Sequence, residues 1–243
     1  LAMFGVCCLT LTGIAYGALP TDYHESFIPH QVIIPKLKVP TDLKTDLTQA
    51  PWDKAAMLTG NMDTRRIRTA NVPVWTYMFY DQDALWIGYR NETQSGKELK
   101  AEVRERDGDM KKDATFTFEL DVGPTGRVFY RFVINSAGNL CDSVIIDKKW
   151  NSHAEIKSVP DDKGWTVVMR VPFSDFGHQE PPVGTRWTFD AQTRIGIENH
   201  WASVLGGYHT PEEFASVIFG GENVQPARML DFKPLVAGDN TFH

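Results

Sequence analysis

The chain has 243 residues, of which 42% are hydrophobic and 12% aromatic, enough to build one large domain around a substantial core. Its formal net charge is −6 and it has no run of Lys and Arg, so the sequence excludes the basic surface that nucleic acids or anionic membranes require. The Gly-x-Ser-x-Gly, P-loop, Gly-x-Gly-x-x-Gly and His-Glu-x-x-His motifs are also missing, which excludes the common enzymes built on them.

The first residues have the pattern of a secretory signal. Residues 1–14 form an uncharged, mostly apolar run that is too short and wrongly flanked for a transmembrane span. Small residues follow at Ala15 and Gly17, as at a signal-peptidase site. We therefore expect residues 1–18 to be the remnant of a signal peptide, and the mature protein to be secreted, periplasmic or at the cell surface.

The chain has three cysteines, and removal of that signal leaves only Cys141. A single cysteine forms no internal disulfide. Cys141 lies in an apparent strand, where it is expected to pack as an apolar side chain. A lipid on Cys7 or Cys8 is an alternative for the leading segment. Against it, Val6 stands where a small residue is expected before Cys7.

Residues 19–46 are expected to form an extended segment that wraps over the domain. The segment is rich in proline and polar residues, with a short β-branched run at 31–35. Because proline donates no ladder hydrogen bond, this run suits an edge strand. The main domain is expected over residues 47–233, followed at 234–243 by a tail or a linker to a missing region.

Short β-rich runs separated by turn residues fill the rest of the chain. In residues 114–121, for example, Phe116, Phe118 and Leu120 fall on one face, as alternation along a strand requires. Such a pattern predicts an all-β fold, a β-sandwich or a barrel. Of the two, the fold that we expect is an immunoglobulin-like antiparallel β-sandwich. The expected strands cover residues 75–80, 84–90, 114–121, 128–135, 139–147, 165–171 and 187–194, with short helical turns at 172–176 and 211–214.

Aromatic residues are the main positive signal for function. The chain has seven tryptophans, and not all of them are expected to face inward. Those in strands (Trp86, Trp165 and Trp187) are expected in the core, and Trp75 in the core or at its rim. Trp201 and Tyr208 lie in or near expected loops, where exposed aromatic rings indicate binding. Such rings stack on the flat C–H faces of sugars, while amides and charged groups bind the hydroxyls.

Polar side chains form a second pattern. Asp190, Gln192 and Arg194 alternate along one strand and so share a face, which is either a binding row or a solvated surface. Glu119 and Asp121 share a face in the same way and are the acidic pair that a glycosidase reading would use. The histidines are scattered and are interpreted as surface residues, among them His200.

At this point a series of motifs, in order over residues 47–220, resembles the family 9 carbohydrate-binding modules (CBM9). Pro51-Trp52-Asp53-Lys54-Ala55 resembles their W-x-x-A opening, and residues 80–87 resemble the YDDDNLYV hairpin. Residues 164–173 resemble GWTVEMAIPF. Weaker matches follow the same order at 116–121, 130–138, 187–194 and 201–215. The resemblance implies a β-sandwich and a non-catalytic sugar-binding function.

The family's site carries over only in part. Its modules hold a terminal sugar between two tryptophans, and the resemblance places Tyr208 at one of them and Lys111, in a loop without aromatics, at the other. A glutamine of the family corresponds to Gln192. The acidic residue falls at Thr117. An arginine of the family falls near Val133, with Arg131 two residues away on the same face.

We therefore predict a non-catalytic carbohydrate-binding module of an exported protein, which recognises a glycan or polysaccharide. The candidate sugar-binding residues are Tyr208, Gln192, Trp201, Arg131, Asp190, Trp150 and Arg194. The family's calcium ions are structural, and a calcium ion at the acidic loop 107–113 is the lesser alternative to a solvated loop.

Three other functions stay open from the sequence. A haem-binding electron-transfer sandwich would draw axial ligands from Met78, Met110, Met169 or His209, which no motif links. A glycoside-active enzyme, or an accessory domain of one, would need a carboxylate pair in a cleft. A structural or interaction domain would bind no sugar.

Overall fold

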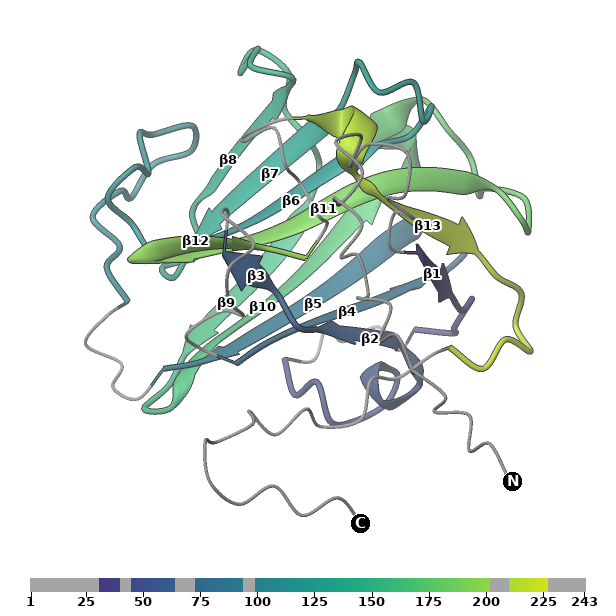
Figure 1. Cartoon of the computed structure of the whole chain (residues 1–243), viewed down its shortest axis with the longest axis horizontal. Helices are drawn as coiled ribbons and strands as arrows, with labels where there is room; N and C mark the ends of the chain where they lie inside the picture. The colour runs from purple at the N-terminus through teal and green to yellow at the C-terminus, as the bar shows by residue number, and fades with distance from the viewer. Residues whose placement is uncertain (1–30, 40–44, 64–72, 94–98, 202–209, 227–243) are drawn as a thin grey trace, which may run out of the picture.

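The computed structural model describes residues 31–39, 45–63, 73–93, 99–201 and 210–226. Within them, the chain forms two β-sheets that pack face to face (Figure 1). The expected signal at 1–18, the tail at 234–243 and the loop that contains Tyr208 lie outside the described residues. The expected all-β sandwich is thus confirmed.

The larger sheet has eight strands and the smaller sheet five. The larger sheet follows the order β1 (Gln31–Ile34), β13 (Ala215–Phe219), β11 (Arg186–Ile195), β6 (Thr115–Asp121), β7 (Tyr130–Asn135) and β8 (Leu140–Val144), with β12 (Ile197–His200) paired to β11 and β3 (Met62–Asp63) paired to β12. The smaller sheet follows the order β2 (Ala56–Thr59), β4 (Val74–Tyr80), β5 (Ala84–Glu92), β10 (Gly164–Pro172) and β9 (Glu155–Pro160). In the described part of the chain, short 3₁₀ helices lie between strands at η1 (Trp52–Lys54), η3 (Phe173–Phe176) and η4 (Pro211–Glu213), the last two at the expected helical turns.

The core between the sheets follows from alternation along the strands. Phe116, Phe118 and Leu120 of β6 point inward and are fully buried, together with Tyr89 of β5 and Trp165 of β10. Tyr89 packs flat against Phe116, with ring centroids 4.3 Å apart, and edge-on against Trp165. These aromatic contacts join the two sheets and fix which face of each strand is left for the outside.

The N-terminal segment behaves as an edge strand, as its prolines predict. β1 pairs with β13 in parallel, which is a departure from a purely antiparallel sandwich. Its side chains alternate, with Val32 and Ile34 buried and Gln31 and Ile33 exposed. This single row of inward side chains is what an edge strand lying on a core requires.

The outer face of the smaller sheet is covered at one end by residues 47–55. Leu47 and Trp52 pack there against Phe79, with Trp52 edge-on to Phe79 at 4.9 Å. Gly88 makes this approach possible, because a Cβ at that position would lie 2.8 Å from Leu47 Cδ2 and 2.9 Å from Trp52 Cζ3. The buried Trp52 of the W-x-x-A motif is therefore a structural residue.

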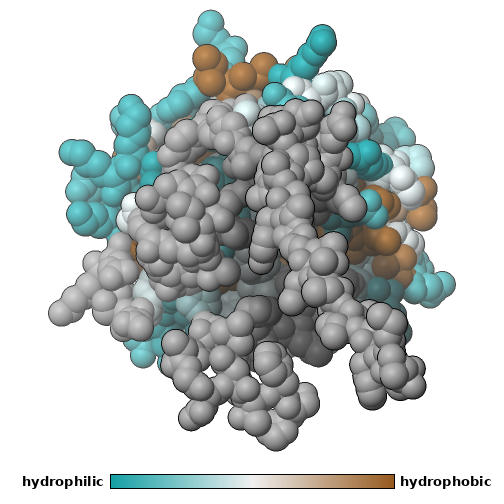
Figure 2. Space-filling model, viewed as in Figure 1, coloured by the Kyte–Doolittle hydropathy of each residue, from teal (hydrophilic) through white to brown (hydrophobic). Residues whose placement is uncertain are grey.

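Figure 2 shows how polar and apolar side chains of the described residues are distributed on one face of the molecule. Its described residues are mostly hydrophilic there, with small hydrophobic patches near the edges. Large exposed apolar side chains, such as Ile146 and Val183, are scattered over separate loops. Among the residues that the structure describes, no helix has the length and apolarity to span a bilayer.

Candidate functional site

The outer face of the larger sheet carries a row of polar side chains across three strands. Asp190 of β11, Glu119 of β6 and Arg131 of β7 stand opposite one another in register. In the next row, Gln192 stands opposite Thr117. These positions alternate with core residues on each strand, so their side chains point away from the core.

Glu119 is the centre of this row. Its Oε2 accepts a hydrogen bond of 3.0 Å from Gln192 Nε2. Its Oε1 lies 3.1 Å from Arg131 Nε, an ion pair whose geometry is not that of a directed hydrogen bond. Glu119 and Gln192 are buried, whereas the Arg131 side chain is 30% exposed. Arg131 is therefore the end of the network that solvent and ligands can reach.

Asp190 has a separate partner in His200. The His200 Nδ1 lies 2.6 Å from Asp190 Oδ2, and both residues are buried. The prediction of a surface histidine at this position is wrong, because β12 folds back on β11 and places His200 in register with Gln192. Gly196 allows this tight return with its positive φ of 76°.

Two buried carboxylates thus stand opposite each other on adjacent strands. Burial of a charged group is costly unless hydrogen-bonding or charged partners compensate for the lost water. Arg131 and Gln192 supply these partners to Glu119, and His200 supplies one to Asp190. The result is two neighbouring polar clusters, Glu119 with Arg131 and Gln192, and Asp190 with His200, whose side chains are held in place before any ligand arrives.

Asp121, the other acid of the pair that a glycosidase would use, contacts the backbone of a turn. Its carboxylate accepts hydrogen bonds from the backbone N–H of Gly123 and of Gly126. It therefore holds the turn between β6 and β7, and it is not linked to Glu119 by any described hydrogen bond. The described contacts of Glu119 come from other strands, from Arg131 of β7 and Gln192 of β11.

Arg194 lies on the same face of β11 as Asp190 and Gln192 but has a structural contact. Its guanidinium donates to the carbonyl oxygen of Met110 at 2.6 Å, which holds the loop before β6 against the sheet. Met110 packs there against Val133 and Cys141. Cys141 is buried and free, as the sequence predicts.

The acidic loop 107–113 is tied to the backbone. Buried Asp113 accepts hydrogen bonds from the N–H groups of Glu102 and Val103, and Asp107 accepts one from the N–H of Asp142. Among the described residues, no group of three acidic, histidine or cysteine side chains is arranged to hold a metal ion.

The predicted aromatic residues are placed differently from one another. The Trp201 ring is buried and stacks on Phe189, with centroids 5.3 Å apart, so it is a core residue and presents no exposed platform. Its position next to an apparent loop was misleading, because the indole turns inward and donates to the carbonyl of Thr59. Trp150 is half-buried and packs on Tyr130 and the core. Tyr208 lies outside the described residues.

The methionines named for a haem are packed. Met78 and Met169 are fully buried between the sheets, and Met110 is buried in its own cluster with Cys141. His209 lies outside the described residues. The described residues therefore do not bring two of these candidate ligands together around an open space.

Solved structures share this fold. A CBM9 from Caldicellulosiruptor kristjanssonii in complex with cellotriose matches with a TM-score of 0.61 and 12% identity, over 86% of this chain and 100% of that one. A CBM9 from the same organism in complex with glucose matches with a TM-score of 0.61 and 14% identity, over 81% and 100%. A candidate carbohydrate-binding protein from Bacteroides uniformis matches with a TM-score of 0.63 and 14% identity, over 79% and 100%.

No protein-family model matches the chain, and no curated protein matches it in sequence. At identities of 12–14%, the structural likeness establishes the fold. The fold of this chain is a β-sandwich like that of the CBM9 structures.

Proposed function

We propose that this chain is a non-catalytic carbohydrate-binding module of an exported protein and that it holds a glycan at the outer face of the larger sheet. The observation that supports this proposal most strongly is the network of Arg131, Glu119 and Gln192 across three strands. The fold is also similar to those of modules solved in complex with cellotriose and with glucose, which supports a sugar ligand by analogy.

Arg131 is the direct contact in this proposal. A guanidinium offers several N–H donors in one plane, which suits the adjacent hydroxyl oxygens of a sugar ring. Buried Glu119 orients the guanidinium, and Gln192 holds the carboxylate of Glu119 in turn. Because the side chains are already fixed, little conformational entropy is lost when the sugar binds.

The same geometry favours binding over hydrolysis. A glycosidase needs one carboxylic acid and one carboxylate that both reach the glycosidic bond. Here Glu119 and Asp190 are fully buried, and each is engaged by a neighbouring side chain. We therefore propose that both carboxylates position other side chains and perform no chemistry on the ligand.

Export is part of the proposal and depends on the apolar residues 1–14 and the small residues that follow. A secreted, periplasmic or cell-surface location would bring the module to polysaccharides. N-terminal sequencing of the mature protein from its native host tests this, and an intact N-terminus on cytoplasmic material would contradict it.

The variant Arg131→Ala tests the site. We expect the wild-type chain to bind a cello-oligosaccharide saturably in isothermal titration, and Arg131→Ala to lower the affinity by about tenfold or more, as for a lost charged hydrogen bond. Arg127→Ala is the matched control, since Arg127 is an exposed arginine in the nearby turn. Equal losses in both variants would contradict a specific role for Arg131.

A further inference from the structure

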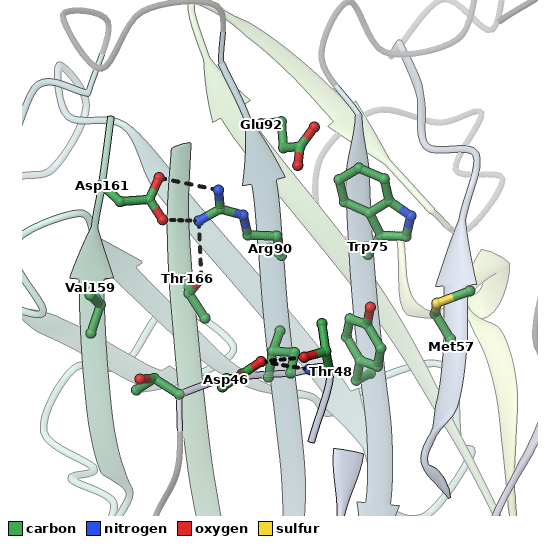
Figure 3. Close-up of a pocket in the computed structure, with 12 residues that line it drawn as sticks. Asp46, Thr48, Met57, Trp75, Arg90, Glu92, Val159, Asp161 and Thr166 are labelled. Atoms are coloured by element: carbon green, nitrogen blue, oxygen red, sulfur yellow. Dashed lines mark hydrogen bonds and ion pairs between the residues drawn. The ribbon is translucent and has the colours of Figure 1, made fainter. Parts of the chain in front are cut away.

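The outer face of the smaller sheet is open where residues 47–55 cease to cover it. A groove of about 480 Å³ lies there, with Trp75 and Tyr77 of β4, Arg90 of β5 and Thr166 of β10 along it. Figure 3 shows these strands side by side. Across the sheet, the side chains follow one another in the order Trp75, Arg90, Thr166 and Asp161. This face lies on the opposite side of the sandwich from Glu119.

Two aromatic side chains form one side of the groove. Trp75 and Tyr77 occupy alternate positions of β4, so both point outward, about 6.8 Å apart along the strand. Both side chains are half-buried, and the Trp75 indole makes no hydrogen bond within the described part of the chain. Five of the seven tryptophans (Trp52, Trp86, Trp165, Trp187 and Trp201) are buried, so a partly exposed indole needs a reason.

The opposite side of the groove is a fixed polar row. Arg90 stands in register with both Trp75 and Thr166. Its guanidinium holds Asp161 with two contacts, NH1 to Oδ2 at 2.6 Å and NH2 to Oδ1 at 3.1 Å, and also reaches Thr166 Oγ1 at 3.2 Å. The planar guanidinium is thus held on the strand next to Trp75, with its end turned toward Asp161 (Figure 3).

The charges around the groove select against an anionic ligand. Asp161 neutralises Arg90, and the two other charged side chains along the groove, Asp46 and Glu92, are acidic. Aromatic faces next to neutralised polar groups suit a neutral polyhydroxylated ligand, whose C–H faces stack while its hydroxyls bind the polar row.

We propose that this groove is a second carbohydrate site, which takes a neutral oligosaccharide. Sugar rings stack on Trp75 and Tyr77, and their hydroxyls contact Arg90, Asp161 and Thr166. The two aromatic positions make the platform longer than a single ring, so the groove holds a chain segment rather than one sugar. The proposal extends the proposed function to the opposite face but does not depend on Arg131.

The test isolates the groove in the Arg131→Ala chain. Isothermal titration with cellohexaose, xylohexaose and mannohexaose is expected to leave saturable binding of at least one of them. Adding Trp75→Ala lowers that affinity by about tenfold or more, and adding Trp75→Phe lowers it less, because a flat ring is retained. Ile146→Ala, at an exposed apolar side chain outside the groove, leaves it unchanged.

Chemical oxidation gives a second measurement that a misfolded variant cannot imitate. N-bromosuccinimide is expected to oxidise Trp75 in the wild-type chain, and the bound hexasaccharide to slow that oxidation, as located by peptide mass spectrometry. An oligogalacturonate of the same length, which is acidic, is not expected to bind in the groove. Stronger binding of this acidic sugar than of any neutral one overturns the proposal.

The outcomes separate the two faces. The proposal of a groove site is overturned if folded Trp75→Ala binds the hexasaccharide with unchanged affinity and if the hexasaccharide does not protect Trp75 of the wild-type chain from oxidation. The proposal for the Arg131 face would then still stand. If Trp75→Ala lowers the hexasaccharide affinity and Arg131→Ala does not, the groove site is supported and the proposed site at the Arg131 face is overturned. If no neutral oligosaccharide binds the wild-type chain, both proposals are overturned.

Discussion

Glu119 shows how a single buried charge organises the outer face of the larger sheet. It is fully buried, yet it contacts the buried Nε of the partly exposed Arg131, and it accepts a hydrogen bond from Gln192, which lies 73 residues later in the sequence. Such a residue is expected to stabilise the fold and to position the guanidinium. The two roles can be separated by measuring stability and affinity on the same variant.

We expect Glu119→Ala to lower the free energy of unfolding by about 3 kcal/mol, because Arg131 and Gln192 lose a buried partner. Urea denaturation followed by tryptophan fluorescence measures this loss. Glu105→Ala, at an exposed glutamate, is expected to change it by less than about 0.5 kcal/mol. A loss as small for Glu119 as for Glu105 would contradict the buried ion pair.

Asp161 gives a pH-dependent prediction at the groove. The hydrogen bond from Arg90 lowers the pKa of the Asp161 carboxyl below its ordinary 3.8, helped by backbone N–H groups of its own turn. A depressed folded-state pKa stabilises the fold at pH values above the unfolded pKa, and that stability is lost as the pH falls through the folded pKa. The carboxylate is partly exposed, so the effect is small.

Wild type is therefore expected to be slightly more stable than Asp161→Asn at pH 7, and the difference is expected to shrink below about pH 4. Thermal unfolding of both proteins across this pH range measures it. A difference that grows as the pH falls would reverse the sign and contradict the Arg90–Asp161 contact.

At the scale of elements, the sequence predicts the central strands well and the short ones poorly. β4, β5, β6, β7, β8, β10 and β11 lie where alternation and turn residues indicate. β2, β12 and β13 were not expected, because four or five residues carry little periodicity. β9 was also missed, since it is an edge strand with mostly exposed side chains that ends at Pro160.

Gly88 lets residues 47–55 pack closely on the smaller sheet, next to the groove that Leu47 lines. Gly88→Ala is expected to lower the free energy of unfolding by about 1–3 kcal/mol, because the new Cβ would overlap Leu47 and Trp52. Gly221→Ala is the matched control, since its Cβ would meet only Val183 at 4.0 Å. Equal stability of the two variants would show that residues 47–55 do not press on the sheet as described.

At the scale of the whole molecule, the two outer faces of the sandwich differ. The face of the larger sheet carries buried, mutually compensated charges, whereas the face of the smaller sheet leaves aromatic side chains half-exposed next to a neutralised arginine. The first arrangement is rigid, and the second is accessible. A module with both could hold a polysaccharide chain on either side, which would raise its avidity for a polymer.

The candidate site was only partly predictable from the sequence. The shared face of Asp190, Gln192 and Arg194 follows from alternation within one strand, which is a local property. The partnership of Glu119 with Arg131 and Gln192 depends on the register of three strands, which no local pattern encodes. Trp201 looked exposed because its neighbours resemble a loop.

The measurement that tests the central claim most directly is a glycan array probed with the purified wild-type chain. We predict saturable binding to one class of neutral glycan, confirmed by isothermal titration with the best ligand and weakened by Arg131→Ala but not by Arg127→Ala. A chain that circular dichroism shows to be folded, yet that binds no glycan on the array, would contradict the carbohydrate-binding account and leave a CBM9-like sandwich with a different partner.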